Sequence, residues 1–355
     1  MKAPFLATLI IPLCISCSYW DSESGSLSSE LSDISERLNP TQTFKILPIK
    51  DTLLAGNLGT KIFIKANSLI MEDGEPATGS VTVKLKEVYS ISDMILNGLS
   101  TTSDGKLLTT SGMINLAATS KGENLKLNHE LPIKIQFKKV ADAPSMRTYL
   151  AIEDSVGIDW QLDKKNINDT VRFVTTKQYV RTLSDEGDEV GVLKVEYGIV
   201  AKDTFELARY FVRSLWSDRS IELDSAVIDN HLSHYEIHST QLNWINCDYF
   251  IPNDANITIF VEKLDDSETQ TFLIFSGLNA IMRSWEYDNI STTFKNIPLG
   301  SEATILSIAK TETGHFFFMQ KRNLSEDLEE IVPKYKKMSI DKISDQLKKL
   351  DINLE

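Results

Sequence analysis

The stretch that decides the fold is SVTVKLKEV (80–88), in which apolar and polar residues alternate along the chain. Val81, Val83, Leu85 and Glu87 fall on one side of an extended backbone, and the residues between them fall on the other. The same period of two recurs in TKIFIKA (60–66), MINLAAT (113–119), ENLKLN (123–128) and PIKIQFKK (132–139). These runs predict half-buried β-strands.

Turn residues separate the alternating runs. MEDGEP (71–76) and SDGK (103–106) each contain an Asp-Gly pair, and glycine supplies the positive φ that tight turns require. SISDMILNGL (90–99) is expected to form a single helical turn or an arm that links strands. Short strands with frequent turns predict an antiparallel β-sandwich domain over residues 43–165.

The second half of the chain repeats the strand pattern after a different kind of connector. Residues 166–234 are expected to form a connector that contains one helix at DTFELARYFVRSLW (203–216). A C-terminal β-domain is expected over 235–323, and a helical tail over 324–355. The predicted fold is therefore mainly β, with two antiparallel β-sandwich-like domains, one central helix and a C-terminal amphipathic helix. Its strand-like runs are YEIHSTQLNWINCDYF (235–250), NITIFVEKL (256–264), TQTFLIFSGLNAIMRS (269–284), TTFKNIPLG (292–300) and ATILSIAKTETGHFFFMQKR (303–322), and its tail helix is SIDKISDQLKKL (339–350).

The N-terminus, MKAPFLATLIIPLCISC (1–17), has the composition of an export signal. A single Lys2 precedes an apolar run that ends at Ile15. That run is too short for a membrane span, which needs about 20 residues. It matches the apolar region of a signal peptide, expected over residues 1–16.

Ile15-Ser16-Cys17 resembles the bacterial lipobox, in which a small residue precedes a cysteine that is acylated and becomes the new N-terminus. This resemblance implies that Cys17 carries lipid, including palmitate-type chains. Ser18 follows it in place of the aspartate that retains lipoproteins in the inner membrane of enteric bacteria, and by that analogy we expect an outer-membrane protein that faces the periplasm or the cell surface. The alternative is an ordinary secretory signal that leaves Cys17 as a free thiol. Residues 17–42 are expected to form an acidic, serine-rich tether. Within it, Leu27, Leu31, Ile34 and Leu38 have helical spacing, which predicts a short helix that packs on its own domain or docks a partner.

A longer resemblance covers about a third of the chain. Gly59-Thr60, Ala66 to Leu69, Gly79 to Glu87 and Thr101 to Met113 resemble a β-sandwich module of uncharacterised envelope lipoproteins of the Bacteroidetes. Trp244 to Phe250 (W-I-N-x-D-x-F) and Ile297 to Gly300 resemble a second β-region of the same family. The resemblance implies protein contacts and no known catalytic residues.

Charge and cysteine content limit the partners and the cross-links. The formal net charge is −13 and the sequence shows no basic stripe, so nucleic acid is not an expected partner. Of three cysteines, Cys14 would leave with the signal and Cys17 would carry lipid. Cys247 then has no partner for a disulfide and is expected to be a buried, small apolar residue.

Candidate chemistry is weak. His231, His234 and His238 have ligand-like spacing, yet His234 and His238 would lie about 13 Å apart on an extended strand, too far to share zinc without a bend. Ser339 and Lys342 have the S-x-x-K spacing, but no other penicillin-binding motif occurs. Asp265-Asp266 offers loop carboxylates without the spacing of a calcium loop.

The sequence therefore predicts a cell-envelope lipoprotein that is a non-catalytic binding or structural interaction module. Its expected partners are the membrane, through its lipid anchor, and another envelope protein, with no cofactor. The alternative is an envelope hydrolase that uses His231, His234 and His238, with or without a zinc ion.

Overall fold

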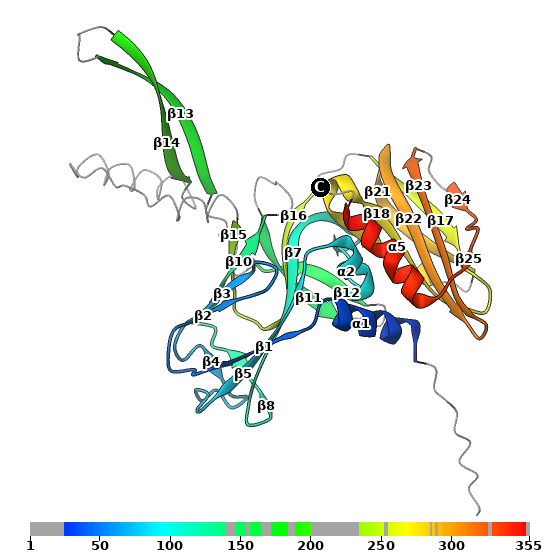
Figure 1. Cartoon of the computed structure of the whole chain (residues 1–355), viewed down its shortest axis with the longest axis horizontal. Helices are drawn as coiled ribbons and strands as arrows, with labels where there is room; N and C mark the ends of the chain where they lie inside the picture. Colours follow the sequence, from blue (N-terminus) through cyan, green and yellow to red (C-terminus); the bar gives the residue numbers. More distant parts are fainter. Residues whose placement is uncertain are drawn as a thin grey trace, which may run out of the picture.

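The computed structural model describes residues 25–139, 146–153, 157–164, 172–183, 189–200, 234–251, 255–284, 286–287, 290–325 and 329–352. Over these residues the chain is mainly β with antiparallel sheets, which confirms the predicted fold class (Figure 1). The expected signal peptide, Cys17 and the helix expected at 203–216 lie outside the described residues.

Two sheets form the first sandwich. Sheet I has the strand order β1-β5-β7-β16-β11-β12, with β6 and β8 also paired to β7, and sheet II has the order β15-β10-β3-β2. The strands of sheet I are β1 (Gln42–Ile46), β5 (Val81–Val88), β6 (Thr102–Ser103), β7 (Lys106–Ser120), β8 (Glu123–Asn124), β11 (Arg147–Glu153), β12 (Ile158–Leu162) and β16 (Asn243–Phe250). Those of sheet II are β2 (Thr52–Ala55), β3 (Lys61–Ile64), β10 (Ile133–Lys138) and β15 (His234–Ser239). A short pair, β4 (Leu69–Ile70) and β9 (Lys126–Leu127), lies beside them.

The apolar residues of the alternating runs fill the core between sheets I and II. Val81, Val83 and Leu85 of β5 are buried in this core, as are Ile62 and Ile64 of β3. Glu87 continues the same face of β5 and is also fully buried. The period of two thus correctly predicted which side of these strands faces inward.

Strands β15 and β16 belong to the first sandwich. β15 pairs with β10 from His234 to Ser239, and β16 is inserted between β7 and β11. The sequence analysis placed these residues in a C-terminal domain that begins at 235. The observed strand pairing instead places them in the first sandwich. Local periodicity identifies a strand but carries no information about its partner, which explains the difference.

A second sandwich is built from later residues. Sheet III has the order β19-β18-β22-β23-β25, and sheet IV has the order β20-β21-β17-β24, in which β24 runs parallel to β17. The run at 303–322 contains two strands, because β22 and β23 form a hairpin that closes at Thr311 and Gly314. The strands are β17 (Asn256–Glu262), β18 (Glu268–Phe275), β19 (Ala280–Arg283), β20 (Glu286–Tyr287), β21 (Ser291–Pro298), β22 (Ser301–Thr311), β23 (Gly314–Leu324), β24 (Glu329–Ile331) and β25 (Lys336–Lys337), and a 3-10 turn, η2 (Ser276–Leu278), precedes β19.

A layer of helices joins the two sandwiches. α1 (Leu27–Leu38), α2 (Ile91–Leu96) and α5 (Ile340–Ile352) lie between sheets I and III (Figure 1). Their buried side chains share one core with residues from both sheets. That core includes Leu27, Leu31, Ile34, Ile91, Met94, Ile95, Ile343 and Leu347 from the helices, Met113, Tyr149 and Trp160 from sheet I, and Phe272, Ile274, Leu306 and Ile308 from sheet III.

Helix α1 is attached to both sandwiches by polar contacts as well. Lys86 of β5 donates to the carbonyl oxygens of Ser35 (3.3 Å) and Asn39 at the C-terminal end of α1, where a cation is favoured. Glu30 near its other end pairs with Lys310 (2.7 Å) and His315 (2.5 Å) of sheet III. The prediction that this helix packs on its own protein is confirmed, and the part of the expected tether from residue 27 onward belongs to the fold.

Strands β13 (Arg172–Leu183) and β14 (Glu189–Val200) form an antiparallel hairpin. The sequence analysis expected no strands here, because residues 166–200 are polar and lack a clear period. β14 nevertheless has apolar residues at every second position from Leu193 to Ile199, a period of two that is typical of a strand.

Glu87 and Thr60, which belong to two of the motifs described in the sequence analysis, meet in a buried polar cluster. The carboxylate of Glu87 accepts hydrogen bonds from the backbone N–H groups of Leu58 (3.0 Å) and Thr60 (3.0 Å) and from the side chain of Gln42 (2.7 Å). The Thr60 hydroxyl lies 2.7 Å from the Tyr89 hydroxyl, whose ring packs against Phe137. Glu87 therefore links sheet I to the β2–β3 turn, and a buried carboxylate with three donors is well compensated.

Gly112 is required by close packing in this region. Its φ is +137°, and a Cβ added there would lie 2.5 Å from the Tyr89 ring. We expect Gly112→Ala to lower the free energy of unfolding by about 3 kcal/mol through steric overlap and backbone strain. Urea denaturation measures this loss.

Gly122→Ala is the matched control, because Gly122 also has a positive φ (+87°) but nothing lies within 4 Å of an added Cβ. It should lose only about 1 kcal/mol from strain. Equal losses in the two variants would show that the contact with Tyr89 contributes nothing.

Candidate functional site

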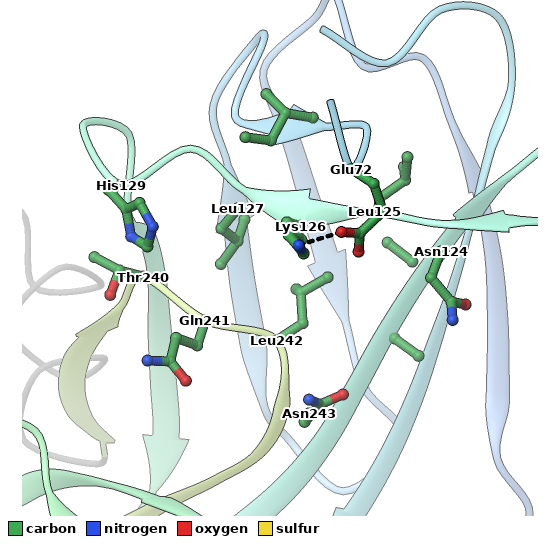
Figure 2. Close-up of a pocket in the computed structure, with 13 residues that line it drawn as sticks. Glu72, Asn124, Leu125, Lys126, Leu127, His129, Thr240, Gln241, Leu242 and Asn243 are labelled. Atoms are coloured by element: carbon green, nitrogen blue, oxygen red, sulfur yellow. Dashed lines mark ion pairs between the residues drawn. The ribbon is translucent and has the colours of Figure 1, made fainter. Parts of the chain in front are cut away.

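A cavity of about 650 Å³ opens at one side of the first sandwich (Figure 2). Its walls come from the β8–β9 segment, from two neighbouring residues of β7 and from the turn between β15 and β16. The lining residues are Ile70, Glu72, Ala117, Ala118, Asn124, Leu125, Lys126, Leu127, His129, Thr240, Gln241, Leu242 and Asn243. A cavity of this size is within the range of small-ligand sites.

The turn between β15 and β16 is held in a fixed shape. The Ser239 hydroxyl donates to the carbonyl oxygen of Gln241 (2.8 Å) and accepts from the Gln241 N–H (3.1 Å). Asn243 has a φ of +75°, a conformation that asparagine tolerates better than most residues. These features present Thr240, Gln241 and Leu242 along one wall of the cavity.

The floor of the cavity is apolar and its rim is mostly uncharged. Leu125, Leu127 and Ala118 are buried and also belong to the sandwich core. The amide side chains of Asn124 and Gln241 lie on different sides of the opening (Figure 2). Amides both donate and accept hydrogen bonds, so this rim suits a ligand with hydroxyl or amide groups.

One ion pair crosses the upper rim. Lys126 pairs with Glu72 (Figure 2), and more than half of each side chain is exposed. Exposed pairs of this kind stabilise a protein only weakly. The pair therefore leaves the cavity mouth close to neutral and available to exchange its partners.

The histidines of the sequence analysis are separated. His234 and His238 lie on the same face of β15, opposite Lys138 and Lys134 of β10, in an extended strand. His231 lies outside the described residues. Among the residues that the structure describes, no three His, Cys, Asp or Glu side chains are grouped so that they could hold a metal ion.

The remaining candidates occupy ordinary surface positions. Ser339 precedes α5 and its carbonyl oxygen accepts from the Ile343 N–H, while Lys342 is exposed. Asp265 and Asp266 are exposed in the turn before β18. His129, on the cavity rim, was not singled out by the sequence, since a lone histidine after a short strand carries no motif.

The W-I-N-C-D element forms a second buried polar cluster. Asn246 donates to the Asp248 carboxyl group (2.6 Å) and accepts from the Thr110 hydroxyl (2.8 Å), which also accepts from the Gly112 N–H (3.0 Å). Burial raises the pKa of Asp248 well above its usual range, although these neighbours act to lower it. Cys247 is fully buried, as predicted, and burial raises the pKa of its thiol.

Asp248 makes the stability of the fold depend on pH. Because its pKa is higher in the folded chain than in the unfolded one, ionisation of the unfolded chain above about pH 3.8 favours unfolding. We expect the contribution of Asp248 to lower the free energy of unfolding as the pH rises above about 4 toward neutrality, and Asp248→Asn to remove that contribution. Urea denaturation across this range measures it, with the exposed Asp33→Asn as control. An unchanged pH dependence in Asp248→Asn would contradict the assignment.

None of the helices in the described part of the chain has the length and hydropathy needed to cross a bilayer. No protein-family model and no curated protein matches this chain. Function is therefore inferred from the sequence motifs and from the geometry of the molecule.

Proposed function

We propose that this chain is a lipid-anchored protein of the cell envelope that acts by binding, with the cavity of Figure 2 as its ligand site. The observation that carries the proposal is the neutral amide rim over an apolar floor. Ligand sites commonly combine an apolar lining with a few placed polar groups.

The chemistry of the rim favours a neutral, hydroxyl-rich ligand such as a segment of a sugar chain. Each sugar hydroxyl both donates and accepts, as do the amides of Asn124, Gln241 and Asn243. The C–H faces of a sugar ring would contact Leu125 and Leu242 on the floor and wall. The ion pair between Lys126 and Glu72 supplies further donors and acceptors at the mouth.

The N-terminal sequence supports the anchor. Ile15-Ser16-Cys17 resembles a lipobox, and the apolar run before it matches a signal peptide. Gly25, where the described fold begins, follows Cys17 by only eight positions, a separation that an extended chain spans with at most about 28 Å. An acylated Cys17 would therefore hold α1 and the adjoining sheets close to the bilayer. The outer sheets, II and IV, can lie farther from the membrane.

The cavity assignment can be tested with rim variants. Asn124→Ala and Gln241→Ala should each weaken binding of neutral glycans about fivefold on a glycan array, because each removes about one hydrogen bond. Both residues are exposed, so the fold should be unaffected. The exposed Asn323→Ala in sheet III is the matched control. Glycan binding that survives both rim variants, or no glycan binding at all, would contradict this site.

The anchor has its own test. Cys17→Ala should release the protein from membranes into the soluble fraction, because two or three buried acyl chains provide stable anchoring that protein charge cannot replace. Fractionation and intact-mass measurement of the native protein would detect the change and the added lipid. A native protein with an unmodified residue 17, or with a different first residue, would contradict the anchor without affecting the cavity.

A further inference from the structure

The outer face of sheet II is basic, although the chain as a whole is acidic. Side chains that alternate with the buried core residues point outward from β3, β10 and β15. They form three short rows, and each row begins and ends with a lysine or a histidine. The rows are Lys61, Phe63 and Lys65; Lys134, Gln136 and Lys138; and His234, Glu236 and His238.

The charges on this face sum to a positive value. Four lysines, Lys61, Lys65, Lys134 and Lys138, face two carboxylates, Asp51 and Glu236, which gives +2 with neutral histidines. Lys134 lies 3.4 Å from Glu236 and 4.3 Å from the centre of the Phe63 ring. Against a net charge of −13 for the whole chain, this face is a local site of attraction for anions.

Strand β2 provides an open edge next to these lysines. It is the last strand of sheet II, and no described strand pairs with its other side. The Gly56 N–H donates to Thr60, so by the alternation of antiparallel pairs Leu54 bonds to β3. The N–H and C=O groups of Leu53 and Ala55 therefore point to the open edge.

Exposed apolar side chains surround this edge. Leu47 (48% exposed), Ile49 (65%), Leu53 (54%) and Leu58 (40%) all fall between residues 47 and 58. A hollow of about 690 Å³ lies beside Leu53 and is lined also by Phe63, Lys65, Lys134 and His238. Open edges with apolar side chains are normally protected, because they bind other strands.

We propose that the open edge of β2 binds an extended, acidic peptide segment of a partner protein, which adds a strand to sheet II. Main-chain hydrogen bonds would form with Leu53 and Ala55. An apolar side chain of the peptide lies opposite Leu53 and enters the hollow beside Phe63. An acidic side chain two residues away lies opposite Ala55, whose small side chain leaves room for Lys61 on the adjacent strand to reach it.

The same geometry disfavours other anionic partners. Lysines on one strand of this face are four residues, or about 13 Å, apart, whereas each strand of duplex DNA carries a phosphate about every 3.4 Å along the helix axis. A bilayer is also disfavoured, since α1, where the N-terminal segment enters the fold, lies on the other side of sheet I from sheet II (Figure 1). An open backbone edge offers nothing specific to a polysaccharide.

This inference deepens the proposed interaction role and rests on it, but it does not depend on Cys17 or on the cavity of Figure 2. Loss of membrane anchoring or of glycan binding would leave the edge intact. Failure of the edge would likewise leave the other two assignments unaffected, so the tests are distinguishable.

The probe is a short fluorescent peptide in which every second residue is threonine. The positions between the threonines hold a central valine and one glutamate on each side of it, so that these three side chains face the lysines. Fluorescence anisotropy should show binding to the full chain that weakens with salt. Ala55→Pro should weaken binding at least about tenfold, because it removes one edge N–H while the bonds from Leu54 to β3 remain. Ala55→Ser, which keeps that N–H, should bind like the wild type.

Charge reversal identifies the contact. Lys61→Glu should weaken binding about fivefold and should prefer a peptide with lysine in place of glutamate. Lys84→Glu, on an exposed site of β5, is the matched control for reversed charge and should bind like the wild type. The proposal is overturned if the peptide does not bind, if Ala55→Pro binds normally, or if Lys61→Glu shows no preference for the lysine peptide. Tighter binding of single-stranded DNA than of the peptide would also overturn it.

Discussion

Burial of α1, α2 and α5 between sheets I and III is the interaction on which the rest of the structure depends. Neither sheet could leave its helix-facing side in water, because each already carries a large apolar surface there, from Met113 and Trp160 to Phe272 and Leu306. Each fully buried leucine or isoleucine contributes about 2 kcal/mol. The helix layer therefore fixes two separately built sandwiches into one arrangement, in the order sheet II, sheet I, helices, sheet III and sheet IV.

Two buried carboxyl groups show how polar groups are accommodated around this core. Glu87 has donors for both of its oxygens, so burial is compensated and the β2–β3 turn is held against sheet I. Asp248 has partners on one oxygen, while its other oxygen is buried without one, and its pKa rises accordingly. Both belong to the motifs behind the family resemblance. At these two positions the motifs contribute to the buried scaffold, and the residues that line the cavity of Figure 2 lie outside the motifs.

The two surfaces proposed for binding differ in chemistry because different layers form them. The cavity lies where loops of sheets I and II meet, and its rim combines amide side chains with the exposed ion pair of Lys126 and Glu72. The open edge belongs to sheet II alone and combines lysines with exposed leucines and an isoleucine. A protein with both could hold a neutral ligand and an acidic protein segment at the same time, as expected of an interaction module. The hairpin of β13 and β14 adds a further element to the same half of the chain.

The sequence by itself determined most of the strands other than β13 and β14, many of the turns, the two terminal amphipathic helices and the sides of β3 and β5 that face the core. Those features depend on neighbours along the chain, so local periodicity and turn chemistry are sufficient to predict them. Only the tertiary structure decided that β15 and β16 join the first sandwich, that the helices form a shared core, and that turn 240–243 closes a cavity with β9. It also decided that Lys61, Lys65, Lys134 and Lys138 share a basic face. The sequence contains no continuous basic stretch that predicts this face. Pairing between distant strands brings such residues together, and the sequence of one strand does not encode the identity of its neighbour.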